Sequence, residues 1–467
     1  MTDPADLSLA EASQAVRHRE TTSLSLTESI LARIGSLQPD LNCFVRIDAD
    51  VALASAERAD REIDAGHYRG PLHGIPLAHK DMFDRTGCIT GMGSRVANRA
   101  ADQTATVLAR LNAAGAVDLG VLNMDELAAG DTGINPTFGR CHNPWSRSHI
   151  SGGSSAGSAC AVAARLAFGA LGGDTGGSIR QPAAACGVVG LKPTYGLVSR
   201  AGAAARAWSL DCIGPITRTV ADCALMLQAV AGHDPQDTST GQSDLPQYYA
   251  DLSNSIAGTR IGIPVGDWFQ DVSNEIAAGL DKAIRLLCGL KAIAIELEIP
   301  DLPLINDLHQ IIVKSEAAKI HGKTLRHSPD ALSERVRENL HEGLLIPESR
   351  YIEALSLRAE LRQSHVAHVF ANVDVVIAPV AFDPVPTYAE VESRQTGFSE
   401  SARLTRFANY LGIPSLAVPC GFTSNGLPMG FQLLAPCYAE PVLLRVGHVY
   451  LEEAGWHRAI PPAAVNG

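Results

Sequence analysis

The sequence predicts an α/β protein with a largely parallel sheet. Residues 104–115 have the periodicity of an amphipathic helix that ends at a glycine, and residues 116–122 form the apolar run of a strand directly after it. Helix-like segments and short apolar runs keep alternating towards the C-terminus, which is typical of βαβ units. With 467 residues and 46% apolar side chains, the chain can build two or three average domains or one large α/β unit.

The N-terminal segment, residues 1–65, is expected to be helical and to serve packing. Ser8 with Glu11 and Ser25 with Glu28 each match a capping box ahead of apolar periodicity, so two short helices are expected within residues 7–35. Residues 50–65 continue this pattern with alternating alanine and charged side chains.

Residues 75–80 have the pattern of a short apolar strand that ends on Lys80. Because lysine is rarely buried unless it is paired, one interpretation is a surface lysine at the end of a strand. The other is a desolvated lysine whose lowered pKa allows it to act as a base. The strand alone favours the surface lysine and leaves both interpretations open.

Two clusters rich in serine and glycine follow a long loop at residues 123–145. The first cluster reads SGGSSAGS at residues 151–158, and the second reads GGDTGGSIR at residues 172–180. Between them, residues 159–170 are rich in alanine and form a helix by composition. Long loops in compact proteins tend to be functional, so we expect hydroxyl groups and free backbone N–H groups to meet here.

The rest of the chain supplies further strands and helices. Residues 303–370 are the most polar and helix-rich part, and we expect them to pack over the sheet as an insertion. Strands are expected at residues 186–191, 196–198, 260–264, 373–378, 415–419 and 429–434, and helices at residues 220–231, 274–290 and 441–454.

Composition limits the classes of function. A net charge of −12 with 19% charged residues argues against binding to nucleic acid or to an anionic membrane. The N-terminus lacks the apolar core of a signal peptide, and the most apolar window, residues 158–173, is too short to cross a bilayer, so a soluble cytoplasmic protein is expected. The ten cysteines lack metal-ligand spacing and are expected to be reduced and mostly buried, with no metal bound.

Each cluster offers a candidate nucleophile. Ser155 lies in a G-x-S-x-G run, but the polar, turn-like residues 143–148 do not look like the buried strand that a nucleophile elbow requires. Ser178 follows a stretch whose successive N–H groups can stabilise an oxyanion, although a serine needs a base and neither cluster contains histidine. A phosphate-binding Walker A loop is excluded, because no G-x-x-x-x-G-K-[ST] run occurs.

Several runs together resemble the amidase signature family. They are Lys80, NMDEL at 123–127, GGSSAGS at 152–158, GDTGGSIRQP at 173–182, CGVVGLKPT at 186–194, DCIGP at 211–215 and GFQL at 430–433. The resemblance implies one large domain, residues 1–467, with a mixed, mostly parallel twisted sheet covered by helices on both faces. Within it, residues 70–235 would be the catalytic core.

The resemblance also implies a catalytic set without a cofactor. Ser178 would be the nucleophile, Ser154, on a cis peptide, would relay its proton, and Lys80 would be the base. The family pattern places the oxyanion hole at the N–H groups of Thr175, Gly176, Gly177 and Ser178. Gly152, Gly153 and Ser155 would support the relay loop, and Asp174 would form an ion pair with Arg180.

The substrate is expected to be a small amide, cleaved to release ammonia or an amine. The core is also similar to the glutaminase subunit of the tRNA-dependent amidotransferase, and enzymes of the biuret or allophanate type are a further alternative. However, the family's aspartate that grips the amino group of glutamine is Ala402 here. We expect Gly130, Asp131, Thr132, Trp208 and Ser209 to line the pocket, and family precedent allows a homodimer.

Overall fold

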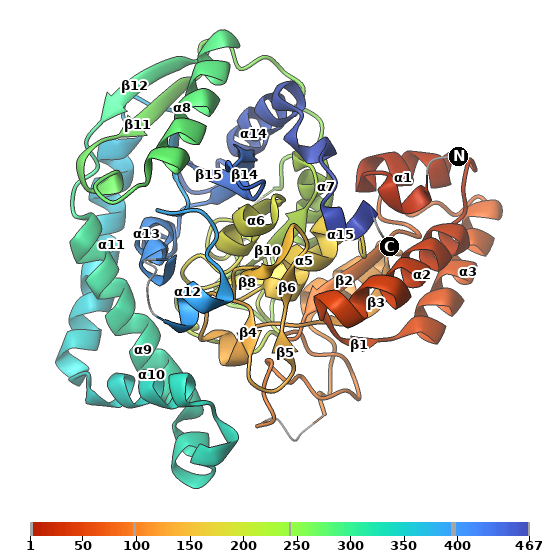
Figure 1. Ribbon diagram of the computed structural model, residues 1–467, viewed down its shortest axis with the longest axis horizontal. Coiled ribbons are helices and arrows are strands. Elements are labelled where there is room, and N and C mark those ends of the chain that lie inside the picture. Colours follow the sequence, from red (N-terminus) through yellow and green to blue (C-terminus); the bar gives the residue numbers. More distant parts are fainter. Residues whose placement is uncertain (1–2, 97–99, 242–243, 394–397, 466–467) are drawn as a thin grey trace.

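A computed structural model describes residues 3–96, 100–241, 244–393 and 398–465, and places an 11-stranded sheet at the centre of the molecule (Figure 1). The strand order is β1-β3-β2-β8-β10-β9-β14-β15-β13-β11-β12. Their bounds, in that order, are Phe44–Ile47, Val117–Leu122, Pro76–Lys80, Gly169–Asp174, Cys212–Thr217, Val189–Lys192, Ser415–Phe422, Pro428–Leu434, Val375–Pro379, Arg260–Pro264 and Ile293–Leu297.

The mixed α/β sheet is confirmed, but the expected parallel majority is wrong. Only β2 with β3, β2 with β8, β11 with β13 and β11 with β12 are parallel, and the six other neighbouring pairs are antiparallel. The chain passes from β8 to β9 through α6 (Arg180–Cys186), and β10 then inserts between these two strands in the opposite direction. A short turn joins β14 to β15, and such turns permit only antiparallel pairing.

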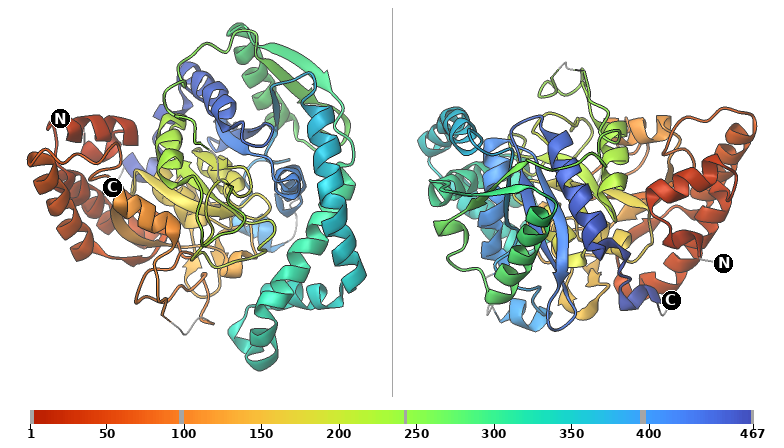
Figure 2. Two further views of the ribbon diagram at one scale, coloured as in Figure 1. Left: turned by 180° about the vertical axis from the view of Figure 1, so that it is seen from behind. Right: turned by 90° about the horizontal axis from the view of Figure 1, so that it is seen from above.

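The N-terminal helices lie beside the β1 edge of the sheet (Figures 1 and 2). Helix α1 (Leu9–Arg17) begins with the predicted capping box of Ser8 and Glu11. The second predicted box is wrong, because α2 (Ser23–Leu41) begins two residues earlier and its cap is Thr22, which accepts the N–H of Ser25. Helix α3 (Ala49–Asp64) follows β1.

The helix between the two clusters is shorter than expected. Helix α5 spans Ala156–Ala163, and Gly169 and Ala170 already belong to β8. All residues of α5 and α6 are buried, and their small side chains allow this close packing. The expected strand at residues 196–198 is reduced to one bridge between Val198 and Ala231, and Cys186 belongs to α6.

The polar region at residues 303–370 is helical, as expected. It contains α9 (Leu302–His327), α10 (Glu334–Leu345) and α11 (Glu348–Val369). Helix α9 packs mainly on α13 (Ala402–Leu411), where Leu308 and Ile312 share an apolar cluster with Leu404 and Phe407. These helices therefore lie beside the part of the chain that follows β8.

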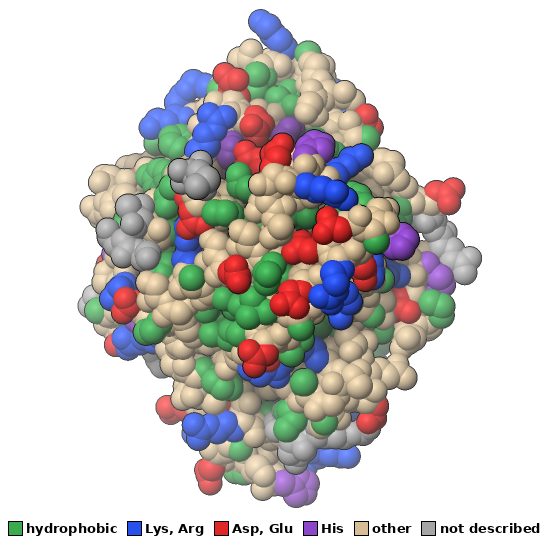
Figure 3. Space-filling view, turned by 90° about the vertical axis from the view of Figure 1, so that its right-hand side faces the viewer, with side chains coloured by type: hydrophobic (Ala, Val, Ile, Leu, Met, Phe, Trp, Pro, Cys, Tyr) green, Lys and Arg blue, Asp and Glu red, His purple; other side chains and the backbone are tan. Residues whose placement is uncertain are grey.

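The other long helices are α4 (Thr106–Ala113), α7 (Val220–Val230), α8 (Asn274–Gly289) and α14 (Glu440–Ala454). None of the described helices is both long and apolar enough to cross a membrane. On the side of the molecule that carries α1 to α3, acidic, basic and apolar side chains are interspersed (Figure 3). The ten cysteines, all within the described ranges, are unpaired, and seven of them are buried.

Candidate active site

Lys80 lies at the end of β2 and is completely buried. Its Nζ lies 2.7 Å from Ser154 Oγ and 3.0 Å from Ser155 Oγ, and it also reaches the carbonyl oxygen of Gly173 at 3.4 Å. The interpretation of Lys80 as a surface lysine is therefore wrong. The end of the strand delivers the amine into both serine clusters at once.

Burial changes the acid–base chemistry of Lys80. Desolvation lowers the pKa of its amine to about 8, against the opposing effect of the carboxylates of Asp125, Asp174 and Asp211. A lysine with this pKa has a substantial neutral fraction near neutral pH and can accept a proton.

The first cluster turns at a cis peptide bond between Gly153 and Ser154. Ser154 and Ser155 are fully buried at the start of α5. Gly153 has no room for a side chain, because a Cβ there would lie 2.0 Å from Asp125 Oδ2. The Ser155 N–H donates to the carbonyl oxygen of Ser178 at 3.2 Å, so the two clusters are hydrogen-bonded to each other.

A buried ion pair shapes the second cluster. Both oxygens of Asp174 accept hydrogen bonds from Arg180 at 3.0 Å, and neither side chain is exposed. Arg180 also donates to Asn409 at 2.6 Å and to Gln432 at 3.0 Å. Although burial raises the pKa of Asp174, the guanidinium of Arg180 outweighs it and holds this pKa well below its usual range. The structure thus brings Asp174 and Arg180 together as the sequence predicted.

The expected set of four oxyanion donors needs one correction. The N–H of Gly177 donates to Asp174 Oδ1 at 2.7 Å, so this donor is already engaged. The N–H groups of Thr175, Gly176 and Ser178 make no hydrogen bond within the described part of the chain. Sequence could not separate these amides, because the separation depends on the inward turn of the Asp174 carboxylate.

Ser178 is partly exposed, in contrast to the fully buried Ser154 and Ser155. A substrate can therefore reach Ser178 more readily than either serine of the first cluster. None of the described residues hydrogen-bonds to the hydroxyl group of Ser178, so its link to Ser154 stays a prediction. As for the alternative nucleophile Ser155, a strand does precede its cluster, but β7 (Ser146–Ile150) is largely exposed and lies outside the main sheet.

The residues expected to line the pocket have varied surroundings. Gly130 and Thr132 lie against the carboxylate of Asp125, whereas Asp131 forms an ion pair with Arg335 of α10 at 2.9 Å. Trp208 is 41% exposed. The hydroxyl and N–H of Ser209 both donate to Glu316 of α9, at 2.6 and 3.1 Å, so the Ser209 hydroxyl is not free for a substrate.

Sequence reasoning missed four residues around the second cluster and its loop. Burial raises the pKa of Asp125 to about 6, while Arg335 lowers it. His309 Nε2 lies 2.8 Å from the carbonyl oxygen of Thr175, and burial lowers the pKa of this histidine to about 3, so the neutral ring donates the hydrogen bond. Arg406 of α13 lies beside Gly176. Only Asp125 lay in a run that the sequence singled out; the others come from distant helices.

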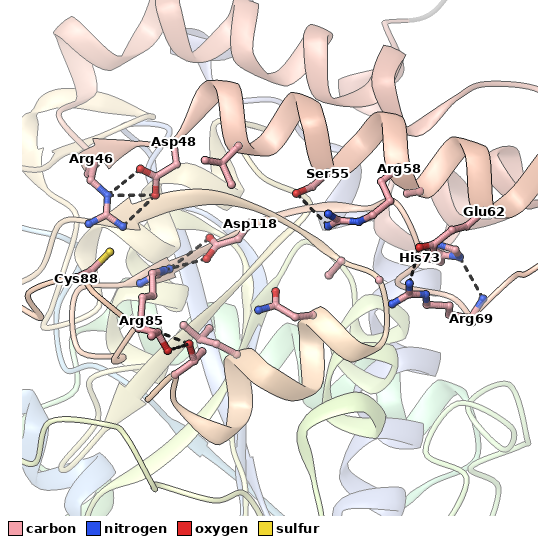
Figure 4. A pocket seen from close by; sticks show the side chains of 18 residues that line it. Arg46, Asp48, Ser55, Arg58, Glu62, Arg69, His73, Arg85, Cys88 and Asp118 are labelled. Atoms are coloured by element: carbon pink, nitrogen blue, oxygen red, sulfur yellow. Dashed lines mark hydrogen bonds and ion pairs between the residues drawn. The ribbon is translucent and has the colours of Figure 1, made fainter. Parts of the chain in front are cut away.

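A cavity of about 650 Å³ lies elsewhere, between α3, α4 and β3 (Figure 4). Two of its arginines are paired with aspartates, Arg46 with Asp48 and Arg85 with Asp118. None of the predicted site residues lines this cavity. Within the described ranges, no group of three or more His, Cys, Asp or Glu side chains could hold a metal ion.

Comparison with known proteins identifies relatives over almost the whole chain. A family model described as Amidase matches residues 25–444. The A-type subunit of the glutamyl-tRNA(Gln) amidotransferase from Geobacter metallireducens is 37% identical over 476 residues, which cover 97% of this chain and 98% of that protein.

Solved structures agree with this result. A chain described as part of a vestigial protein complex, which reveals the origins of an s-triazine catabolic enzyme, superposes with a TM-score of 0.90 at 33% identity and covers 96% of this chain and 99% of that chain. The peptide amidase of Stenotrophomonas maltophilia superposes with a TM-score of 0.85 at 30% identity, covering 97% of this chain and 98% of its own.

Proposed function

Because this chain belongs to the amidase family, we propose that it hydrolyses an amide through an acyl-enzyme formed on Ser178. The observation that carries the proposal is the fully buried Lys80, whose amine lies 2.7 Å from the hydroxyl group of Ser154 in a loop bonded to that of Ser178. Burial makes this amine a base, and the neighbouring loops supply the nucleophile.

The proposed reaction runs in two halves. Neutral Lys80 takes a proton from Ser154, which takes one from Ser178 as Ser178 Oγ attacks the carbonyl carbon. The N–H groups of Thr175, Gly176 and Ser178 stabilise the oxyanion. The proton returns through Ser154 to the leaving nitrogen, the C–N bond breaks, and ammonia or an amine departs. Water then adds to the ester of Ser178 along the same proton path and releases the acid.

Single substitutions test these roles. Ser178→Ala and Lys80→Met should each lower kcat by about a thousandfold or more, and Ser154→Ala should lower it severely, because members of a catalytic unit fail together. Ammonia release from a panel of amides is the measurement, and Ser148→Ala, in the exposed strand β7, is the matched control. Full activity of Ser178→Ala together with loss of activity in Ser155→Ala would instead assign the reaction to the first cluster.

For the substrate, we propose a small amide that the chain cleaves without partner proteins. Helix α13 carries no acidic residue, and its first residue is Ala402, where the family pattern for glutamine binding has an aspartate. A cationic amino group therefore finds no carboxylate on this helix. Biuret and allophanate belong in the amide panel, since a relative of similar fold concerns s-triazine catabolism.

The second candidate is a glutaminase subunit of a tRNA-dependent amidotransferase. The relatives that carry this name favour it, with 37% identity over nearly the full length of both proteins. Purified chain that releases ammonia from small amides but leaves glutamine intact would support the first candidate. Activity that appears only with glutamine and partner proteins would support the second.

A further inference from the structure

Arg406 stands out among the charged side chains near the second cluster. It projects from α13, and a Cβ added to Gly176 would lie 3.4 Å from Arg406 Cγ and 3.1 Å from His309 Cε1. Gly176 is two residues before Ser178 and supplies one of the free N–H groups. Arg406 therefore borders the oxyanion loop itself.

No carboxylate lies within ion-pair distance of Arg406 among the described residues, and the remaining residues of the chain include no Asp or Glu. Its one polar partner is the amide of Gln310, whose oxygen, when turned towards the guanidinium, accepts hydrogen bonds at 2.7 to 3.0 Å. The nearest acidic group electrostatically is Asp131, and Arg335 already engages it at 2.9 Å.

The other arginines of this region have anionic or carbonyl partners. Arg403, three residues earlier on α13, pairs with Asp271 and stacks on Phe382. Arg358 donates to backbone carbonyl oxygens of Tyr410 and Asn409. Arg406 is mostly removed from solvent, which lowers the pKa of its guanidinium to about 10, yet the group stays charged at neutral pH. A desolvated charge without a counter-ion is costly, so a counter-ion brought by a ligand would be bound favourably.

We propose that Arg406 recognises a carboxylate of the substrate, so that the enzyme prefers short amides that carry a negative charge a few bonds from the scissile carbonyl. A planar guanidinium donates two parallel hydrogen bonds to a carboxylate, which Gln310 cannot satisfy by itself. The short range follows from the chain, because the Cα atoms of Gly176 and Ser178 are at most about 7 Å apart. This inference rests on the proposed amide hydrolysis at Ser178.

The first test compares paired amides. Malonamate and succinamate are the charged probes, and malonamide and succinamide are their neutral counterparts. Wild type should show the higher kcat/KM with the charged member of at least one pair. Arg406→Met should lower kcat/KM for that charged amide by about 10- to 100-fold, the usual effect of a charge-assisted hydrogen bond, and leave the neutral amide nearly unchanged. Arg403→Met, on the same helix, should keep the preference. A wild type without this preference, or an Arg406→Met variant that retains it, overturns the proposal.

The second test does not need turnover. Calorimetry with Ser178→Ala should detect binding of the charged amides, and adding Arg406→Met should weaken it by the same factor. Binding that depends on Arg406, in a protein whose wild type cleaves neither amide, would overturn the proposed hydrolysis and leave the anion site standing. Cleavage of neutral amides with no binding of the charged ones would overturn the anion site alone.

Discussion

Lys80 is buried because β2 ends inside the molecule, and that burial is also what makes its amine a base. Desolvation lowers its pKa to about 8, whereas the charges of Asp125, Asp174 and Asp211 hold the pKa up. The strand pattern by itself favoured a surface lysine, since a lysine at a strand end usually reaches solvent. The reversal required the family resemblance and then the positions of Ser154 and Ser155.

The pH dependence of the reaction follows from this amine. Only neutral Lys80 accepts a proton, so kcat/KM for a neutral amide should rise about tenfold per pH unit at low pH and level off above a pKa near 8. A profile of kcat/KM from pH 5.5 to pH 10 measures it. A rate that falls with rising pH across this range would mean that Lys80 acts in its charged form.

Asp125 should tune that profile. Its carboxylate raises the pKa of Lys80, so Asp125→Asn should move the midpoint of the profile to lower pH, while the amide oxygen of the new side chain can still accept the N–H of Gly133. The exposed Asp281→Asn is the matched control and should leave the midpoint in place. An unchanged midpoint in Asp125→Asn would remove Asp125 from the electrostatics of the base.

At the scale of elements, β8 and α6 present the second cluster. Asp174 ends β8, Arg180 begins α6, and their ion pair closes the turn between them. This pair was predictable, because both residues lie in one recognisable run. The engagement of the Gly177 N–H by Asp174, and the approach of His309 and Arg406 from α9 and α13, were not predictable, since they depend on contacts between segments far apart in the sequence.

Breaking the ion pair should destabilise the fold. Arg180→Met leaves Asp174 buried without its counter-ion, which typically costs about 3–5 kcal/mol. Urea unfolding followed by circular dichroism measures the loss. Arg285→Met removes an exposed pair with Asp281 on α8 and should cost less than about 1 kcal/mol. Equal stability of the two variants would contradict a structural role for the Asp174–Arg180 pair.

At the scale of the whole molecule, local patterns predicted most helices and strands but not the direction of the strands. Periodicity located α7, α8, α14 and the strands from β11 to β15 to within a few residues. The insertion of β10 between β8 and β9 reverses the local direction of the sheet, and only tertiary packing sets it. The same limit explains why the catalytic loops were recognised from their sequences while their neighbours from the C-terminal half were not.

The central claim is that Ser178 is the nucleophile and that it depends on Lys80. A fluorophosphonate, which exchanges its fluoride for an activated serine oxygen, tests this claim by peptide mapping with mass spectrometry. The account predicts one label per chain, located on Ser178, and a strongly slowed reaction in Lys80→Met but not in Ser148→Ala. A label on Ser155 or Ser154, or labelling of Ser178 at the same rate without Lys80, would contradict it.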